Sequence, residues 1–157
     1  MFKKIILTLV LTLASLNASD VNTIQSINWE KNFHKAMVKA EEENKPVLFI
    51  YSNHNCKFCV QLEETTLTNK KVIDAVNKDF ISVISYTDEN DYTPGELRGR
   101  GTPYIWFLYP NTKAMFQPIP GAVKVEYFLE ALSSVKKEFA KNWKIKSAKT
   151  TPLGKTK

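Results

Sequence analysis

The sequence predicts an α/β domain in which helices flank a central mixed sheet of four strands. Segments with the spacing of one helical face alternate along the chain with short apolar segments rich in β-branched and aromatic residues. This alternation is typical of parallel strands joined by right-handed crossovers. The chain has 157 residues, no internal repeat and no sign of a second domain, so we expect one such domain over residues 19–140.

Residues 1–18 have the features of a secretory signal peptide. The start is basic, an apolar run follows over residues 5–16, and a small residue, Ala18, stands at the exit. The apolar run is shorter than the ~20 residues that a membrane-spanning helix needs, so we expect export and cleavage after Ala18. Leu16 is larger than is usual at its place before a cleavage site, and an uncleaved anchor is the alternative.

An amphipathic helix is predicted over residues 29–43, before the first strand. Its apolar residues share one helical face: Trp29, Phe33, Ala36, Met37 and Ala40. His34 lies beside this face with no other metal-ligand residue at a suitable spacing, so we expect it to be a surface residue. The first strand is predicted at residues 45–51, because a proline opens this short apolar run and polar residues close it.

The rest of the body follows the same alternation. Apolar residues at helical spacing predict a helix directly after the first strand, another that begins at Asn69, and a closing helix over residues 123–140. Further strands are predicted at residues 80–85, 104–109 and 114–118. We expect the first two strands to be parallel, and the fourth to pair antiparallel with the third after a turn. Pro118 places the fourth strand at an edge of the sheet. Residues 87–101 are expected to be mostly loop.

The only two cysteines, Cys56 and Cys59, stand three positions apart where the first strand leads into a helix. Residues at this spacing in a helix have Cβ atoms ~5–6 Å apart, so a small adjustment reaches the ~3.5–4.5 Å of a disulfide. A helix N-terminus lowers the pKa of a thiol placed there, and Lys57 and His54 can add positive charge. We therefore expect Cys56 to be the nucleophile and Cys59 its resolving thiol. A structural staple is the alternative, but a bond that closes so short a loop adds little stability.

The basic charge of the chain is concentrated at its C-terminal end. The formal net charge is +6, and residues 141–157 alone contain six lysines and no acid. Residues 19–140 are therefore slightly acidic and have no basic stripe, which argues against nucleic-acid binding. We expect residues 141–157 to form a basic flexible tail. Contact of this tail with an anionic membrane surface or an acidic partner is the alternative.

A second motif, Gly101-Thr102-Pro103, directly precedes the predicted strand at residues 104–109. Peptide bonds before proline adopt the cis form with a small energy penalty, so a fixed cis turn can bring the backbone of Thr102 beside the sulfurs. A trans proline in an ordinary loop is the alternative.

The Cys-Lys-Phe-Cys motif after the first strand and the Thr-Pro pair before the third resemble the active-site motif and the cis-proline loop of the thioredoxin superfamily. Phe58, Thr102 and the closing residues 120–129 are similar to those of small periplasmic thiol-disulfide oxidoreductases of bacteria. The resemblance implies a thioredoxin fold over nearly the whole body of the chain. It also implies a periplasmic location and a membrane electron donor that keeps the cysteine pair reduced.

The resemblance further implies a role for each residue of the two motifs. Cys56 would attack a disulfide of a protein substrate, Cys59 would resolve the mixed disulfide, and no cofactor would be needed. Thr102 and Pro103 would hold the substrate backbone, and Phe58 would provide an apolar contact.

The sequence departs from cytoplasmic thioredoxins at two positions. The buried acid that those proteins have six residues before the first cysteine is replaced by Ile50, and the tryptophan directly before that cysteine is replaced by Asn55. Proton transfer to and from Cys59 would therefore need water, His54 or Glu63.

The cysteine pair thus predicts an exported thiol-disulfide oxidoreductase, in the first place a reductase or an isomerase. The direction of electron flow depends on the relative stability of the dithiol and disulfide forms. A reductase dedicated to cytochrome c maturation, acting on the haem-attachment cysteines, is one alternative. A copper-binding or chaperone module is another, although two thiolates are too few for a closed zinc site and Met37 and Met115 form no ligand cluster. We expect no metal site.

Overall fold

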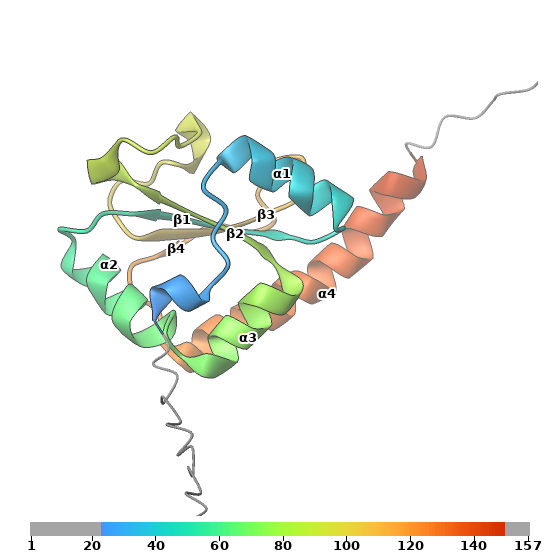
Figure 1. The fold of residues 1–157 in the computed structure, drawn as a ribbon. Coiled ribbons are helices and arrows are strands. Elements are labelled where there is room, and N and C mark those ends of the chain that lie inside the picture. Colours follow the sequence, from blue (N-terminus) through green and yellow to red (C-terminus); the bar gives the residue numbers. More distant parts are fainter. Residues whose placement is uncertain (1–22, 150–157) are drawn as a thin grey trace, which may run out of the picture.

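The computed structural model describes residues 23–149, and their side chains as far as residue 143. The predicted signal peptide and the last eight residues of the predicted tail lie outside the described residues. The fold is a four-stranded sheet with helices on both faces (Figure 1). The strands are β1 (Val47–Ser52), β2 (Ile81–Tyr86), β3 (Tyr104–Leu108) and β4 (Ile119–Pro120).

The sheet is mixed, which confirms the fold class predicted from the sequence. Its strand order is β2-β1-β3-β4, with β1 parallel to β2 and antiparallel to β3, and β4 antiparallel to β3. The parallel register places Ser52 directly beside Tyr86 at the carboxyl ends of β1 and β2. Because β3 runs the opposite way, Tyr104 at its start pairs with Tyr51 at this same end. The segments that lead out of β1 and β2 and into β3 therefore meet at one end of the sheet.

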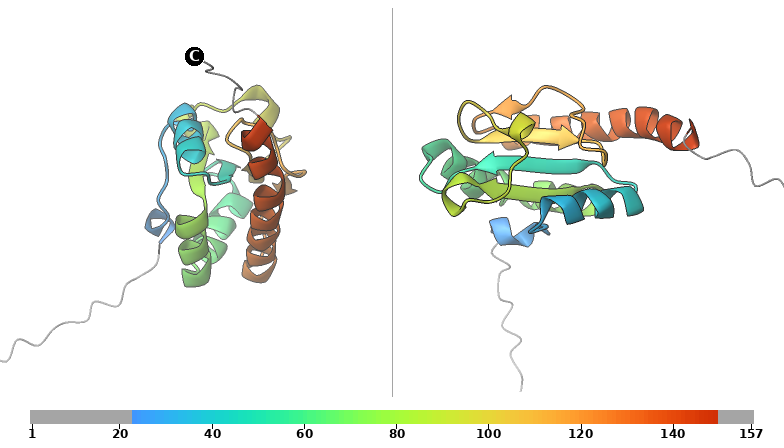
Figure 2. Two further views of the ribbon diagram at one scale, coloured as in Figure 1. Left: turned by 90° about the vertical axis from the view of Figure 1, so that its right-hand side faces the viewer. Right: turned by 90° about the horizontal axis from the view of Figure 1, so that it is seen from above.

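Three helices cover the two faces of the sheet. α1 (Phe33–Glu42) lies on one face, and α3 (Lys70–Asp79) and α4 (Val125–Lys149) lie on the other (Figure 2). The first two of these helices begin at asparagine caps. The side chain of Asn32 accepts the N–H of Lys35, and the side chain of Asn69 accepts that of Lys71, so each cap satisfies a backbone donor that has no partner within its helix.

Side chains alternate along β1, and this separates two hydrophobic cores. Val47 and Phe49 pack on the α1 side, whereas Leu48 and Ile50 pack on the side of α3 and α4. All four side chains are fully buried. Ser52 is the next residue in line with the second pair, so a polar group stands at the end of an otherwise apolar row.

The helix that follows β1 changes its geometry after five residues. α2 (Lys57–Gln61) continues into a π-helical turn, η2 (Leu62–Thr66), instead of the single regular helix that the sequence predicts. The N–H of Leu67 bonds with the carbonyl oxygen of Leu62, five residues back, at 3.0 Å. The buried hydroxyl of Thr66 donates to the carbonyl oxygen of Val123, which ties the turn to the segment before α4. Such turns often lie at functional sites.

The fourth strand lies further along the chain than predicted. The prediction at residues 114–118 is wrong, because the strand is Ile119–Pro120 and only an isolated bridge joins Ala114 to Leu108. The N–H of Met115 bonds with Phe107, and the chain then leaves the sheet before it returns to pair beside Ile105 and Tyr104. A proline at position 118 has no N–H to donate, which fits a break in pairing at that point.

The last helix is also longer than predicted. α4 begins two residues after the predicted start and continues to Lys149 instead of ending at Ala140. Trp143 explains part of the extension, because its ring stacks on those of Tyr109 and Phe139 with centroids 5.9 and 5.8 Å apart. The beginning of the predicted basic tail is therefore helical and packs against the body. Among the helices of residues 23–149, none combines the length and the apolar character needed to cross a bilayer.

Candidate active site

The two cysteines lie at the end of the sheet where β1 leads into α2. Cys56 is the N-cap residue of α2, with extended backbone dihedral angles, and Cys59 lies within the helix. Cys56 is partly exposed, whereas Cys59 is fully buried. Both are free thiols in this structure. One thiol of the pair is thus open to a partner molecule and the other is covered by the protein.

The loop that leads into β3 brings Thr102 against the first of these thiols. The Thr102–Pro103 peptide bond is cis. The thiol of Cys56 donates to the carbonyl oxygen of Thr102, with 3.2 Å between Sγ and O. On the other side of the loop, the N–H of Gly121 donates to the carbonyl oxygen of Pro103 at 2.8 Å. Residues 46 positions apart in the sequence are therefore in direct contact at the site.

The surroundings shift the pKa values of the two thiols in opposite directions. Partial burial raises the pKa of Cys56, but hydrogen bonds from Cys59, from Thr102 and from the backbone N–H groups of Cys59 and Phe58 outweigh it, so the net pKa is lowered. Burial raises the pKa of Cys59, and its hydrogen bond with Cys56 raises it further. Cys56 therefore ionises more readily than Cys59.

The other sequence-predicted residues lie around this pair. Phe58 and Lys57 are exposed on α2, Phe58 with 56% of its surface accessible. His54 lies in the loop before Cys56, where its ring stacks on Tyr86. Neither His54 nor Lys57 is among the groups that lower the pKa of Cys56.

Both ring nitrogens of His54 face carboxylates, those of Asp88 and Glu89. Nδ1 lies 3.0 Å from a carboxylate oxygen of Asp88, and Nε2 lies 3.8 Å from one of Glu89. The other carboxylate oxygen of Asp88 accepts the backbone N–H of His54 at 3.2 Å. The imidazole is therefore directed toward the segment after β2, and its contacts are with carboxylates and an aromatic ring.

Sequence reasoning missed two polar residues that lie beneath the cysteine pair. Ser52 and Tyr86 are neighbours in the parallel register and point to the same face of the sheet. The hydroxyl of Ser52 donates to the carboxylate of Glu63 at 2.8 Å. The sequence offers Glu63 as one of three candidates for proton transfer. No sequence motif identifies Tyr86, because its position beside Ser52 depends on the register of two strands.

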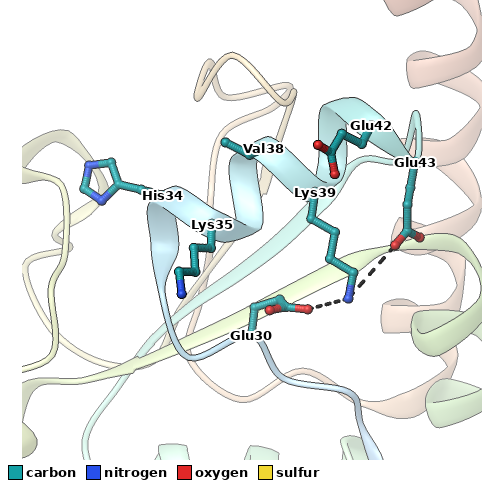
Figure 3. Close-up of a pocket in the computed structure, with 7 residues that line it drawn as sticks. All are labelled: Glu30, His34, Lys35, Val38, Lys39, Glu42 and Glu43. Atoms are coloured by element: carbon teal, nitrogen blue, oxygen red, sulfur yellow. Dashed lines mark hydrogen bonds and ion pairs between the residues drawn. The ribbon is translucent and has the colours of Figure 1, made fainter.

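A surface pocket of about 520 Å³ lies away from the cysteines, on the outer side of α1 (Figure 3). Its wall contains Val38 and an ion pair between Lys39 and Glu30, and no thiol lines it. His34 stands at one end of this pocket and is exposed, as predicted. Within residues 23–149, no three His, Cys, Asp or Glu side chains are grouped so that they could hold a metal ion.

Comparison with known proteins agrees with this architecture. A family model described as a thioredoxin-like domain matches residues 33–136. Anterior gradient protein 3 of Mus musculus is 24% identical over 87 residues, which are 54% of this chain and 51% of that protein. The chain spans about half the length of the anterior gradient proteins that it matches.

Solved structures share the fold, among them a thioredoxin and a domain of DsbD. A thioredoxin from Thermus thermophilus is 22% identical with a TM-score of 0.59, over 70% of this chain and 87% of that chain. The C-terminal domain of DsbD from Neisseria meningitidis, in its oxidised form, is 21% identical with a TM-score of 0.51, over 64% of this chain and 89% of that chain. The family match extends from the start of α1 into α4 and covers well over half of the sequence. The chain therefore belongs to the thioredoxin-like family.

Proposed function

We propose that this protein is an exported thiol-disulfide oxidoreductase that reduces or isomerises disulfides of other proteins. The observation that supports it best is the asymmetry of the two thiols. Cys56 is partly exposed at a helix N-terminus with a lowered pKa, and Cys59 is buried three residues later with a raised pKa. A thiolate is the attacking form of cysteine, so this arrangement suits attack by Cys56 and later resolution by Cys59.

The proposed reaction has two exchange steps. The Cys56 thiolate attacks one sulfur of a substrate disulfide, a Cys56–substrate bond forms, and the other substrate sulfur leaves with the electron pair. Cys59 then attacks the Cys56 sulfur, the Cys56–Cys59 bond forms, and the second substrate sulfur leaves as a thiolate. The cysteine pair is oxidised by two electrons and the substrate disulfide is reduced.

In this proposal the residues around Cys56 bind the substrate. Thr102 and Pro103 hold its backbone next to the sulfur, which the contact of Thr102 with Cys56 and the cis bond between the two residues support. Phe58 provides an exposed apolar surface beside the pair. Lys57 adds a positive charge on α2 beside Cys56, whereas the ring nitrogens of His54 face Asp88 and Glu89.

The proposed location and partner rest on two further observations. Residues 1–18 have the pattern of a signal peptide, which favours export to the periplasm and a compartment where disulfides persist. The similar DsbD domain is described in both an oxidised and a reduced form, so a domain of this fold can be stable in either oxidation state. A membrane electron donor would return this chain to its dithiol form.

Reduction of insulin disulfides tests the proposal. The reduced protein should accelerate insulin reduction, and Cys56→Ser should abolish the acceleration because it removes the attacking sulfur. Glu42→Gln, on the distant pocket of α1, is a control that should keep the activity. Failure of the wild-type protein to reduce insulin or another protein disulfide, together with stoichiometric uptake of copper by the two thiols, would overturn the proposal in favour of a metal-binding module.

A further inference from the structure

The buried position of Cys59 raises the question of where its proton goes. Its side chain is 0% exposed, and burial raises its pKa, so bulk water has no direct access to the thiol that must ionise in the second exchange step. Ile50, fully buried on the same face of β1, offers no titratable group. A proton acceptor for Cys59 must therefore come from another element of the fold.

Ser52 connects Cys59 to a carboxylate. A hydrogen bond with the Ser52 hydroxyl lowers the pKa of Cys59 against the effect of burial. The same hydroxyl donates to Oε1 of Glu63 at 2.8 Å. Ser52 is 1% exposed, so its hydroxyl is shielded from competing water. A hydroxyl that accepts from a thiol while it donates to a carboxylate can pass a proton from the first to the second.

The π-helical turn aims Glu63 at this hydroxyl. Leu62 and Thr66 of η2 are buried and fix the turn on the core, while Glu64 is exposed. Glu63 stands between these two environments and is half-buried. The wider turn therefore presents one carboxylate to the sheet and leaves the next one in solvent.

Tyr86 borders the carboxylate on its other side. It is the parallel partner of Ser52, and its hydroxyl forms a hydrogen bond with Glu63. Burial raises the pKa of Tyr86, and the carboxylate of Glu63 raises it further. Glu89 and Cys59 also raise it. The Tyr86 ring is held by the stacked ring of His54, with centroids 3.8 Å apart. Both nitrogens of His54 face carboxylates of the segment after β2. The imidazole therefore packs on Tyr86 and is not directed at Cys59.

Glu63 also has a path to solvent. A pocket of about 370 Å³ lies between η2 and the segment before α1, and Glu63 is part of its wall together with Val60, Thr68 and residues 23–25. The pocket is wide enough for water. One side of Glu63 therefore faces the buried hydroxyl and the other faces a pocket that water can enter.

We propose that Glu63 exchanges the proton of Cys59 through the Ser52 hydroxyl, and that Tyr86 positions its carboxylate. In the resolving step the thiol proton of Cys59 passes to Ser52 while the Ser52 proton passes to Glu63. The Cys59 thiolate then attacks Cys56, and the neutral Glu63 returns its proton to water in the pocket. The reverse transfers occur when the pair is reduced. This inference rests on the proposed thiol-disulfide exchange.

The test separates the two exchange steps with the aromatic reagent dithiobis-nitrobenzoate and a small excess of reduced protein. Attack by Cys56 releases the first coloured thiolate, and attack by Cys59 on the mixed disulfide releases the second. Glu63→Gln keeps a hydrogen-bond acceptor for Ser52 but cannot take up a proton. We expect it to leave the first phase within about twofold of wild type and to slow the second about 10²-fold at neutral pH. The difference in the second-phase rate between Glu63→Gln and wild type should become smaller as the pH rises, because hydroxide then replaces the carboxylate as proton acceptor.

Three further variants make the result specific. Glu64→Gln removes the same charge one residue along the same turn and should leave both phases unchanged. Ser52→Ala should slow the second phase as Glu63→Gln does, and the double variant should be no slower than either single one, because both act on one path. Tyr86→Phe keeps the ring on His54 but loses the hydroxyl, and should slow only the second phase, about two- to tenfold.

An unchanged second phase in Glu63→Gln, equal slowing of both phases, or equal slowing by Glu64→Gln would overturn the inference. If Glu63→Gln does not fold, Ser52→Ala and its pH profile decide in its place. The proposed function can fail separately. If the two phases depend on Glu63 but the protein reduces no protein disulfide, the proton path is supported and the proposed substrates are wrong.

Discussion

Cys56 and Thr102 are in direct contact, with the thiol of Cys56 bonded to the carbonyl oxygen of Thr102 at 3.2 Å. The contact places the partly exposed sulfur at the edge of the loop that leads into β3. Cys59 lies behind it, away from solvent. The two thiols therefore have different access to a partner.

The different access predicts which cysteine is trapped with a substrate. Cys59→Ser leaves the attacking thiol but removes the thiol that resolves the mixed disulfide, so it should accumulate covalent complexes that a reductant releases. Cys56→Ser should accumulate none. Non-reducing electrophoresis of cells that express each variant checks this, and mass spectrometry of the trapped partners shows whether they are many proteins or cytochromes c alone. Complexes formed by Cys56→Ser would reverse the two roles.

The opposite pKa shifts predict the pH dependence of alkylation. The thiolate is the reactive form, so the rate of alkylation rises as the pH passes through the pKa of each thiol. For Cys56 the midpoint should lie below the ordinary thiol pKa of 9.0, and for Cys59 above it. Iodoacetamide kinetics on the reduced wild-type protein, with the alkylated cysteine identified by mass spectrometry at each pH, measure the two values separately. Equal midpoints would contradict the asymmetry.

The contacts of Asp88 predict the rigidity of the loop before Cys56. Because its carboxylate accepts the backbone N–H of His54 and also contacts the ring, Asp88→Ala should speed hydrogen exchange at the His54 amide by about tenfold. Glu89→Ala is the matched control, since Glu89 contacts only the ring and at a longer distance. Equal exchange in both variants would show that Asp88 does not hold the loop.

The exposure of Phe58 predicts a role in binding large substrates. Phe58→Ala should reduce insulin turnover at low substrate concentration by about tenfold through a raised KM, because the substrate loses its apolar contact with the exposed ring. Alkylation of Cys56 by iodoacetamide should stay the same, since that small reagent needs no apolar platform. A slower alkylation in Phe58→Ala would indicate that the ring supports the thiolate instead.

The ring stack at the end of α4 predicts a loss of stability. Trp143→Ala removes two aromatic contacts, with Tyr109 and with Phe139, and should lower the free energy of unfolding by about 1–3 kcal/mol in urea titration. Tyr127→Ala removes an aromatic ring of the same helix that is 65% exposed and should change it by less than about 0.5 kcal/mol. Similar values for the two variants would mean that residues beyond 140 do not contribute to the fold.

Local sequence signals predicted most of the fold. The apolar run before the cysteines, the helical spacing after Asn69 and the alternation of elements each depend on neighbours in the chain, and each corresponds to an element of the structure. The fourth strand was misplaced because its position depends on where the chain can pair with β3, and Pro118 interrupts that pairing. The extension of α4 was missed because Trp143 finds its partner on Tyr109, 34 positions earlier.

The site was predictable only where its residues lie in one motif. Cys56 and Cys59 are recognisable by their spacing, and Thr102 and Pro103 by their place before a strand. Whether these residues have their expected roles stays a prediction. The positions of Ser52, Tyr86 and Glu63 depend on the register of β1 with β2 and on the π-helical turn. Neither can be predicted from the spacing of neighbouring residues.

The direction of α4 decides how the protein can be attached to a surface. The helix starts next to Val123, which is tied to the turn after the cysteine helix, and it passes Tyr109 at the opposite end of β3 before it reaches Lys149 (Figure 1). A 25-residue helix is about 37 Å long, so its two ends lie far apart. A biotin or resin linker joined after Lys149 would therefore hold the molecule by the end away from its thiols, with Cys56 turned toward the solution.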